Sequence, residues 1–229
     1  VGMYQAKRTR QIEDAAIAAT ESFVAFIDSY ADLRRKTPGN DLISELLAAE
    51  EAGDRLSRAE LITTCILLLN AGHEATVHTL GNGVKTLLET RTGAAALTPA
   101  HAPGTVEEIL RYDPALHLFS RWVYEDIEIG GEIFRRGDRI GVLLGGANRD
   151  PGTWQDPDSF DPTRPVQTNF SFGAGAHFCI GAPLARLELT TALPILFDRL
   201  PGLRLAAPPK YSDLYHFHGL ERLDLRWNA

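Results

Sequence analysis

The segment from Phe172 to Gly181 combines residue types that could hold a metal through sulfur. Glycines let the backbone bend tightly and direct amide N–H groups at a thiolate. A helix that starts just after the cysteine places its positive end at the sulfur, and an aromatic ring can shield the sulfur from water. These features would suit a metal-bound thiolate. The residues concerned are Phe172, Gly173, Gly175, His177, Cys179 and Gly181.

Other interpretations of the same cysteine explain less of the pattern. A cysteine beside glycines is, by itself, most often a buried residue in a turn. A zinc site would need a second ligand pair at usable spacing from His177 and Cys179, and the sequence offers none. A Cys–His hydrolase would not need the glycines.

Two further motifs are weak when taken alone. Glu108 and Arg111 lie one helical turn apart on one face, but most such pairs are solvated and contribute little. Gly72 lies in the middle of a predicted helix, where glycine costs about 1 kcal/mol relative to alanine. Close packing against a neighbouring helix is the simplest explanation for that glycine.

Together, in this order, these motifs resemble the cytochrome P-450 family over nearly the whole chain. The resemblance implies a haem-thiolate protein that binds haem b, with Cys179 as the ligand of the iron. It also implies that Glu108 and Arg111 are joined by Arg164 from a downstream loop, in a structural ion cluster that fixes the cysteine loop. Arg121 and His177 match partners of the haem propionates.

The segment from Ala71 to Thr76 resembles the family's central helix, which crosses the oxygen-binding face of the haem. Ala71 and Gly72 would leave room for dioxygen, and Glu74 matches the acid of the proton relay. The chain departs from the family at the next position, where Ala75 replaces the usual threonine. Thr76 comes one residue later, and a shift of one residue turns a helical side chain by about 100°. We therefore hypothesise that a substrate hydroxyl or an ordered water delivers the proton.

Three segments correspond, by resemblance, to the substrate pocket: Ile66–Thr76, Ala115–Phe119 and His216–Leu220. Their apolar side chains suit a hydrophobic small molecule, and His117 and His218 add polar points. The pocket residues expected are Leu68, Leu116, Leu118, Phe119, Phe217 and His218.

The resemblance implies a monooxygenase that hydroxylates such a molecule with dioxygen and with electrons from a separate ferredoxin or flavoprotein reductase. No flavin or nicotinamide fingerprint is present in the sequence, so a partner must supply reductase chemistry. Two alternatives stay open. The chain could be a truncated, non-catalytic haem-binding remnant, which its start at Val1 favours because that start reads as a cut. It could also use peroxide, which carries its own protons and would suit Ala75.

The composition is that of an ordinary globular protein. The chain has 229 residues, 44% of them hydrophobic, and a formal net charge of -7. That charge argues against nucleic acid as a partner, and no apolar run is long enough to span a membrane. Cys65 and Cys179 lie in different contexts, so a disulfide is not expected and a cytoplasmic location fits.

Hydrophobic periodicity predicts a mainly α fold with small β-sheets, an α+β protein, and the resemblance implies a single partial cytochrome P-450 domain over 1–229. Residues 1–112 are expected to be helical, and residues 113–229 to hold the sheets and the cysteine loop. The expected helices cover Gln5–Arg35, Asp41–Glu50, about 57–89, Thr105–Tyr112 and Pro183–Leu200. Asp41 is expected to cap the second of these helices, and Ser57 and Glu60 have the spacing of a capping box at the start of the third. The stretch from Pro99 to Gly104 is expected to be a loop. The expected strands cover Arg121–Tyr124, Ile127–Ile129 and Arg139–Leu144. The stretch from Ala147 to Phe178 shows almost no periodicity, which in a compact domain is typical of a functional loop.

Overall fold

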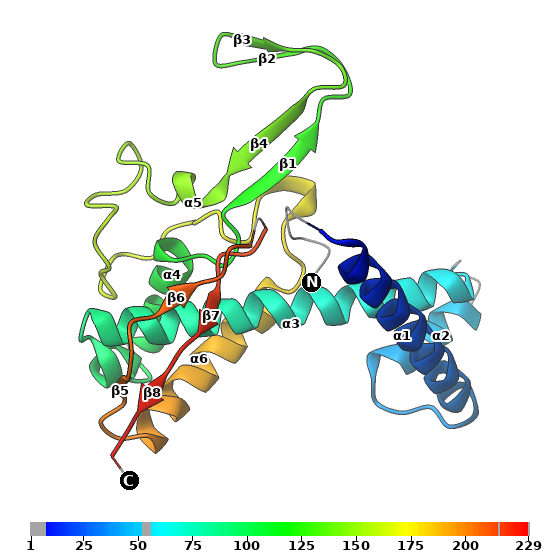
Figure 1. Ribbon diagram of the computed structural model, residues 1–229, viewed down its shortest axis with the longest axis horizontal. Helices are drawn as coiled ribbons and strands as arrows, with labels where there is room; N and C mark the ends of the chain where they lie inside the picture. Colours follow the sequence, from blue (N-terminus) through cyan, green and yellow to red (C-terminus); the bar gives the residue numbers. More distant parts are fainter. Residues whose placement is uncertain (1–7, 52–55, 215, 229) are drawn as a thin grey trace. The chain divides into compact units, whose positions relative to one another are not determined.

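The computed structural model describes residues 8–51, 56–214 and 216–228. The chain divides into two compact units between Glu74 and Ala75, inside one long helix. The mainly α character with small sheets is confirmed (Figure 1). The single-domain organisation stays a prediction. No helix among the described residues is both long and apolar enough to cross a membrane.

The first unit is helical. α1 covers Arg10–Lys36, α2 covers Leu42–Glu51, and α3 begins at Arg58. The predicted start at Gln5 lies outside the described residues. The helix begins at Arg10 because the hydroxyl of Thr9 accepts a hydrogen bond from the backbone of Ile12. The core of this unit consists of Ile27, Ala31, Leu47, Leu61, Ile62 and Cys65.

Both predicted caps in this unit are confirmed. Asp41 accepts a hydrogen bond from the Ser44 backbone at the start of α2. Ser57 and Glu60 form a reciprocal capping box, in which each side chain accepts from the other residue's backbone N–H. This box fixes the start of α3, which runs through to Glu89 as predicted.

The second unit packs the end of α3 against a short 3-10 helix η2 (Gly93–Leu97), α4 (Ala102–Tyr112) and α6 (Ala182–Arg199). The prediction of a loop over Pro99–Gly104 was wrong in its second half. α4 begins at Ala102, because Pro103 fits the first turn of a helix, where its missing N–H is not needed. The buried apolar residues of this core are Val84, Leu87, Ala96, Leu97, Val106, Ile109, Leu110, Leu189 and Leu193.

The described residues of this unit also form four antiparallel two-stranded sheets. β1 (Leu118–Trp122) pairs with β4 (Arg139–Leu143), and β2 (Ile127–Ile129) pairs with β3 (Glu132–Phe134). β5 (Arg204–Leu205) pairs with β8 (Leu225–Arg226), and β6 (Lys210–Tyr211) pairs with β7 (Leu220–Arg222). The first predicted strand was placed three residues too late, and β3 was missed. The β2–β3 hairpin continues outward from the end of the β1–β4 ribbon (Figure 1).

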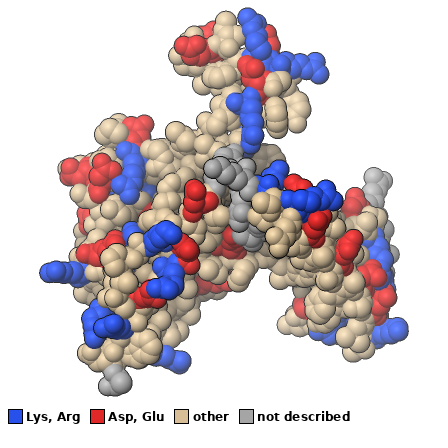
Figure 2. Space-filling view, in the orientation of Figure 1, with Lys and Arg blue, Asp and Glu red and all other residues tan. Residues whose placement is uncertain are grey.

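Between β4 and α6 the chain is almost free of regular structure, as predicted. After a short α5 (Leu144–Ala147), which contains the Leu144 assigned to a strand, only the 3-10 turn η3 (Gly175–His177) interrupts the segment. Local turns satisfy many of its backbone polar groups, and residues of α4 bind several others. Acidic and basic side chains are intermingled on the face drawn in Figure 2.

Candidate functional site

Backbone conformation and backbone hydrogen bonds define the shape of the cysteine loop, Phe172–Gly181. Gly173 and Gly175 have φ angles of 71° and 70°, values that favour glycine strongly. The N–H of Cys179 donates to the Phe172 carbonyl at 3.0 Å, and its own carbonyl accepts from Ala182 at the start of α6, at 3.2 Å. The backbone of the cysteine is thus fixed directly before the start of a long helix.

The side of Cys179 that this structure leaves exposed is apolar. Cys179 itself is exposed, and Ile180 is 88% exposed beside it. Phe178, Leu184 and Leu187 are also exposed large hydrophobic residues. An accessible sulfur donor with exposed apolar residues near it in the sequence would suit an iron macrocycle, to which Cys179 would supply a thiolate ligand.

Phe172 and Arg186 form a half-buried support of the loop. Phe172 packs against the core of this unit, its ring contacts Phe178 edge-on, and the guanidinium of Arg186 lies 4.7 Å above its centroid. Glu107 forms an ion pair with Arg186 and raises the pKa of Arg186, and the charge of Cys179 raises that pKa further. Sequence reasoning missed Arg186, although an arginine on the helix that follows the cysteine was a visible signal.

Glu108, Arg111 and Arg164 lie together in the structure. Arg111 binds both oxygens of Glu108, at 2.7 and 2.8 Å, and Arg164 Nε approaches the same carboxylate at 3.2 Å. Arg111 is 1% exposed. Such a pair is costly to desolvate, so its remaining hydrogen bonds decide whether it is tolerated.

Those hydrogen bonds come from the irregular segment. Arg111 donates to the carbonyls of Asn148, Pro157 and Ser159. The Asp161 backbone N–H donates to Glu108 at 2.9 Å. The cluster therefore ties α4 to several points of a segment that has no sheet or helix to order it.

A second buried polar link was not predicted from the sequence. The Asn148 side chain accepts from the Phe170 backbone at 2.7 Å and donates to Ser171 at 2.8 Å. The hydroxyl of Ser171 donates in turn to the carbonyl of Leu110 on α4. Asn148 is fully buried, and its links end directly before the cysteine loop.

The expected residues of the central helix all lie on α3, where the helix is continuous. Ala71, Gly72 and Glu74 belong to the first unit, and Ala75 and Thr76 to the second. A Cβ at Gly72 would meet no atom of the described chain within 4 Å, so close packing within this chain does not explain that glycine.

The backbone at Ala75 carries an additional hydrogen bond. The hydroxyl of Thr79 donates to the Ala75 carbonyl at 2.8 Å. Ala75 itself offers no hydroxyl, and the unbroken helix keeps the side chain of Thr76 about 100° away around the axis.

The remaining expected residues are placed as follows. Arg121 lies on β1, is exposed, and donates to the carbonyl of Ser120. His177 lies in η3 and is exposed. Two of the three pocket segments, Ala115–Phe119 and His216–Leu220, meet where Leu116 forms a β-bridge with Phe217. Phe119 contacts the ring of His216, Leu118 lies on β1, and Leu68 lies on α3 in the first unit.

Comparison with known proteins points to one family. The family model described as Cytochrome P450 matches residues 102–201. The chain is 42% identical over 224 residues to Cytochrome P450 107B1 of Saccharopolyspora erythraea, covering 94% of this chain and 55% of that protein. The chain spans about half the length of the curated relatives it matches.

The fold of the chain also matches solved structures. The crystal structure of CalO2 aligns with a TM-score of 0.92 at 34% identity, over 98% of this chain and 57% of that one. P450BioI, solved in complex with hexadec-9Z-enoic acid ligated acyl carrier protein, aligns with a TM-score of 0.90 at 38% identity, over 97% of this chain and 58% of that one.

Proposed function

Since the chain belongs to the cytochrome P450 family, whose members bind haem b, we propose that it carries the haem-thiolate site of a monooxygenase. The protein hydroxylates a hydrophobic small molecule with dioxygen, and a ferredoxin or flavoprotein reductase supplies electrons. The observation that carries the proposal is the exposed Cys179, held by a glycine-rich loop at the head of α6.

Cys179 is the residue that would ligate the haem iron, and the apolar side chains beside it would cover the macrocycle. Arg121 and His177 would pair with the two propionates. Bound haem supplies the activation of dioxygen, and a thiolate ligand favours cleavage of the O–O bond. The chain's own residues contribute ligation, positioning and proton supply.

The ion cluster positions the ligand without touching the reacting atoms. Glu108, Arg111 and Arg164 fix the irregular segment to α4, and Asn148 and Ser171 extend this attachment to the cysteine loop. A loop tied at so many points loses little entropy on binding, so the sulfur is preorganised.

Proton supply is the step in which this chain differs from its family. Glu74 is the acid of the relay in this proposal, and the side chain of Ala75 has no hydroxyl that could donate a hydrogen bond. A hydroxyl of the substrate or an ordered water fills that place. Ala75→Thr should then change the coupling of NAD(P)H use to product for at least one substrate. Unchanged coupling for every substrate tried would refute this idea.

The same residue motivates the peroxide alternative, because peroxide brings its own protons. Turnover of a hydrophobic substrate with peroxide and no reductase would favour it, and no turnover would count against it.

The pocket of the monooxygenase proposal includes Leu68, Leu116, Leu118, Phe119 and Phe217. The cytoplasmic location belongs to the same proposal.

The first test is an absorption spectrum of the full chain, supplied with haem, reduced and exposed to carbon monoxide. A strongly red-shifted Soret band indicates thiolate ligation. Cys179→Ala should lose this band, whereas the matched variant Cys65→Ala, which removes the buried cysteine of the first unit, should keep it. Haem bound with an unshifted band in the wild type would refute ligation by Cys179.

A second readout separates the enzyme from a non-catalytic remnant. A chain that binds haem through Cys179 and supports substrate oxidation, in the presence of a reductase and of the parent protein's remaining sequence, is an enzyme. A parent gene that encodes no further family sequence, with haem binding and no turnover, would favour the remnant.

A further inference from the structure

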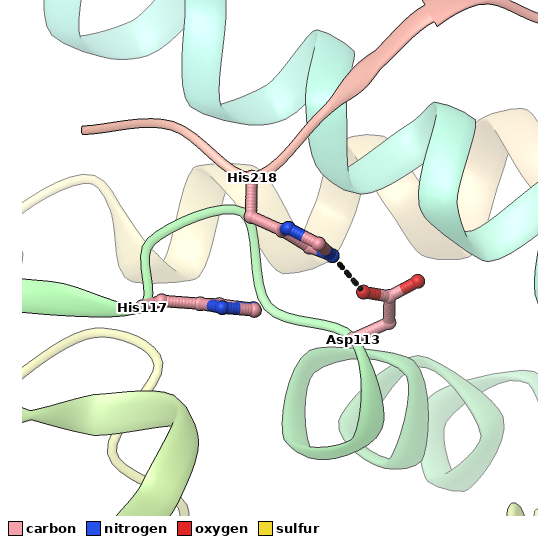
Figure 3. Close-up of side chains that lie close together, drawn as sticks. All are labelled: Asp113, His117 and His218. Carbon is pink, nitrogen blue, oxygen red and sulfur yellow. Dashed lines mark ion pairs between the residues drawn. The ribbon is translucent and has the colours of Figure 1, made fainter. Parts of the chain in front are cut away.

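A cluster of three potential metal ligands lies in the second unit, outside the cysteine site. Asp113 follows α4, His117 precedes β1, and His218 precedes β7. One donor atom from each lies within 4.8 Å of the other two. His218 Nε2 is 3.2 Å from Asp113 Oδ1 (Figure 3). We propose that Asp113, His117 and His218 form a binding site for a first-row transition metal ion such as zinc.

The donor set suits this class of ion. Two imidazoles and one carboxylate are the three protein ligands of many zinc sites that keep a fourth position open. A softer site would offer sulfur, and a calcium or magnesium site would offer oxygen alone. The two cysteines of the chain do not belong to the cluster.

The backbones that carry the ligands are already fixed to each other. The buried side chain of Asn82 donates to the carbonyls of both Asp113 and His218. The N–H of His218 donates to the Ala115 carbonyl at 2.8 Å. The site is therefore preorganised at the level of the main chain, although its two histidines come from segments far apart in sequence.

Neighbouring groups orient the ligands. Tyr211 donates to Oδ2 of Asp113, and the Lys85 ammonium lies 3.5 Å from the same oxygen. Burial alone would raise the pKa of Asp113, but hydrogen bonds from His218 and Tyr211 and the charge of Lys85 leave it lowered. The carboxylate is thus ionised, with Oδ1 turned toward the histidines. A carboxylate held in this way by an outer partner is typical of metal sites.

The two imidazoles need one adjustment. Their rings are stacked, with centroids 4.0 Å apart and planes 24° apart, so their in-plane lone pairs do not converge on one point. His117 is the exposed ring, and Gly145 beside it has no side chain to block a rotation about χ2. Desolvation and the nearby His218 lower the pKa of His117, which favours the neutral, ligating form.

Lys85 limits the strength of the site. Its ammonium repels a dication that binds the same carboxylate, so we expect micromolar rather than tighter affinity. A bound ion would join the loop after α4 to the segment before β7. Because an ion that binds only the folded state stabilises it, zinc should raise the melting temperature of the chain.

The test is titration calorimetry of the full chain with zinc, together with X-ray absorption at the zinc edge. His117→Phe and His218→Phe keep an aromatic ring in the stack but remove the ligand. His101→Phe is the matched control, because His101 is an exposed histidine of the same unit whose ring nitrogen is hydrogen-bonded to Thr98, away from the cluster. We expect one ion for each wild-type chain, with nitrogen and oxygen ligands at about 2.0–2.2 Å.

Each ligand variant should weaken zinc binding by about tenfold or more and lose the rise in melting temperature, while the control keeps both. Equal affinity in all four proteins would overturn the proposal, and so would zinc–sulfur scattering at about 2.3 Å, which would assign the ion to a cysteine. Circular dichroism checks that each variant is folded. The result is independent of haem binding, so it cannot be confused with failure of the haem-thiolate proposal.

Discussion

Two ion clusters of this chain have similar composition and opposite surroundings. In the second unit, Glu108 and Arg111 are 3% and 1% exposed at the side chain, with Arg164 beside them. In the first unit, Arg58 bridges Asp28 and Asp32, and these side chains are 34%, 44% and 56% exposed. Both clusters join segments that are distant in sequence.

The two arginines differ in the hydrogen bonds that they donate to backbone carbonyls, in addition to those that they donate to carboxylates. Arg111 also donates to three backbone carbonyls of the irregular segment, one of which, that of Ser159, also accepts from Arg164. Arg58 serves one, that of Asp28, at a surface where water competes. Burial makes the first cluster a condition for ordering the loop and leaves the second a modest addition to helix packing.

Removing Arg111 should have the largest effect. Arg111→Ala leaves the buried Glu108 carboxylate with Arg164 as its remaining ion partner and removes the donor to three backbone carbonyls, which should cost about 3–5 kcal/mol of unfolding free energy. Arg111→Lys should recover only some of this loss, because an ammonium cannot replace a planar guanidinium that binds both oxygens. Urea denaturation of the full chain, followed by circular dichroism, measures both. A loss below about 1 kcal/mol for Arg111→Ala would contradict the comparison, since removing one partner of a buried pair is strongly destabilising.

Removing Arg164 should have an intermediate effect. Arg111 still binds both oxygens of Glu108 in Arg164→Ala, so the expected cost is about 2 kcal/mol. Proteolysis should report the change first, as faster cleavage within 155–165. The same denaturation experiment gives the free energy, and a loss as large as that of Arg111→Ala would mean that the three charges act as one unit.

Asn148→Ala tests the link that carries no charge. The variant leaves the Phe170 N–H and the Ser171 hydroxyl with one partner fewer, at an expected cost of about 1–3 kcal/mol. It should also slow haem uptake by the chain, since Ser171 lies directly before the cysteine loop. Uptake measured by the Soret absorbance would be unchanged if this link has no bearing on the loop.

The smallest effect should come from the exposed cluster. Arg58→Ala should shift the urea midpoint by little, and less still in high salt, because exposed pairs are screened. Arg58 lowers the pKa of Asp28, so the contribution of that carboxylate is present above its unfolded pKa and is lost as the pH falls through the lowered one. A midpoint shift in Arg58→Ala that matched Arg111→Ala at neutral pH would remove the contrast between the clusters.

Features that depend on residues close together in the sequence could be predicted from the sequence. The capping box at Ser57 and Glu60 involves residues three apart, so its hydrogen bonds depend on local chain geometry alone. The same is true of the glycine-rich loop at Cys179. Boundaries were less accurate: Pro103 was read as a loop residue, although proline fits the first helical turn equally well.

The links made across the fold could not be predicted in this way. Asn148, Ser171 and Arg186 are common residue types in ordinary local sequence, and only their burial against α4 gives them a role. His117 and His218 were expected as isolated polar points of a pocket, and the structure stacks them on each other beside Asp113.

Gly72 and Gly83 show what the sequence by itself determines and what only the tertiary structure decides. Both are mid-helix glycines of α3, and the sequence by itself determined only that each weakens the helix. A Cβ at Gly83 would lie 3.2 Å from atoms of Ile109, whereas a Cβ at Gly72 would meet nothing in the described chain. The sequence determined most of the helices, their caps and the glycine-rich loop at Cys179, because these depend on neighbours along the chain. Tertiary structure decided which polar groups are buried together, because burial depends on segments that the chain brings together only when it folds.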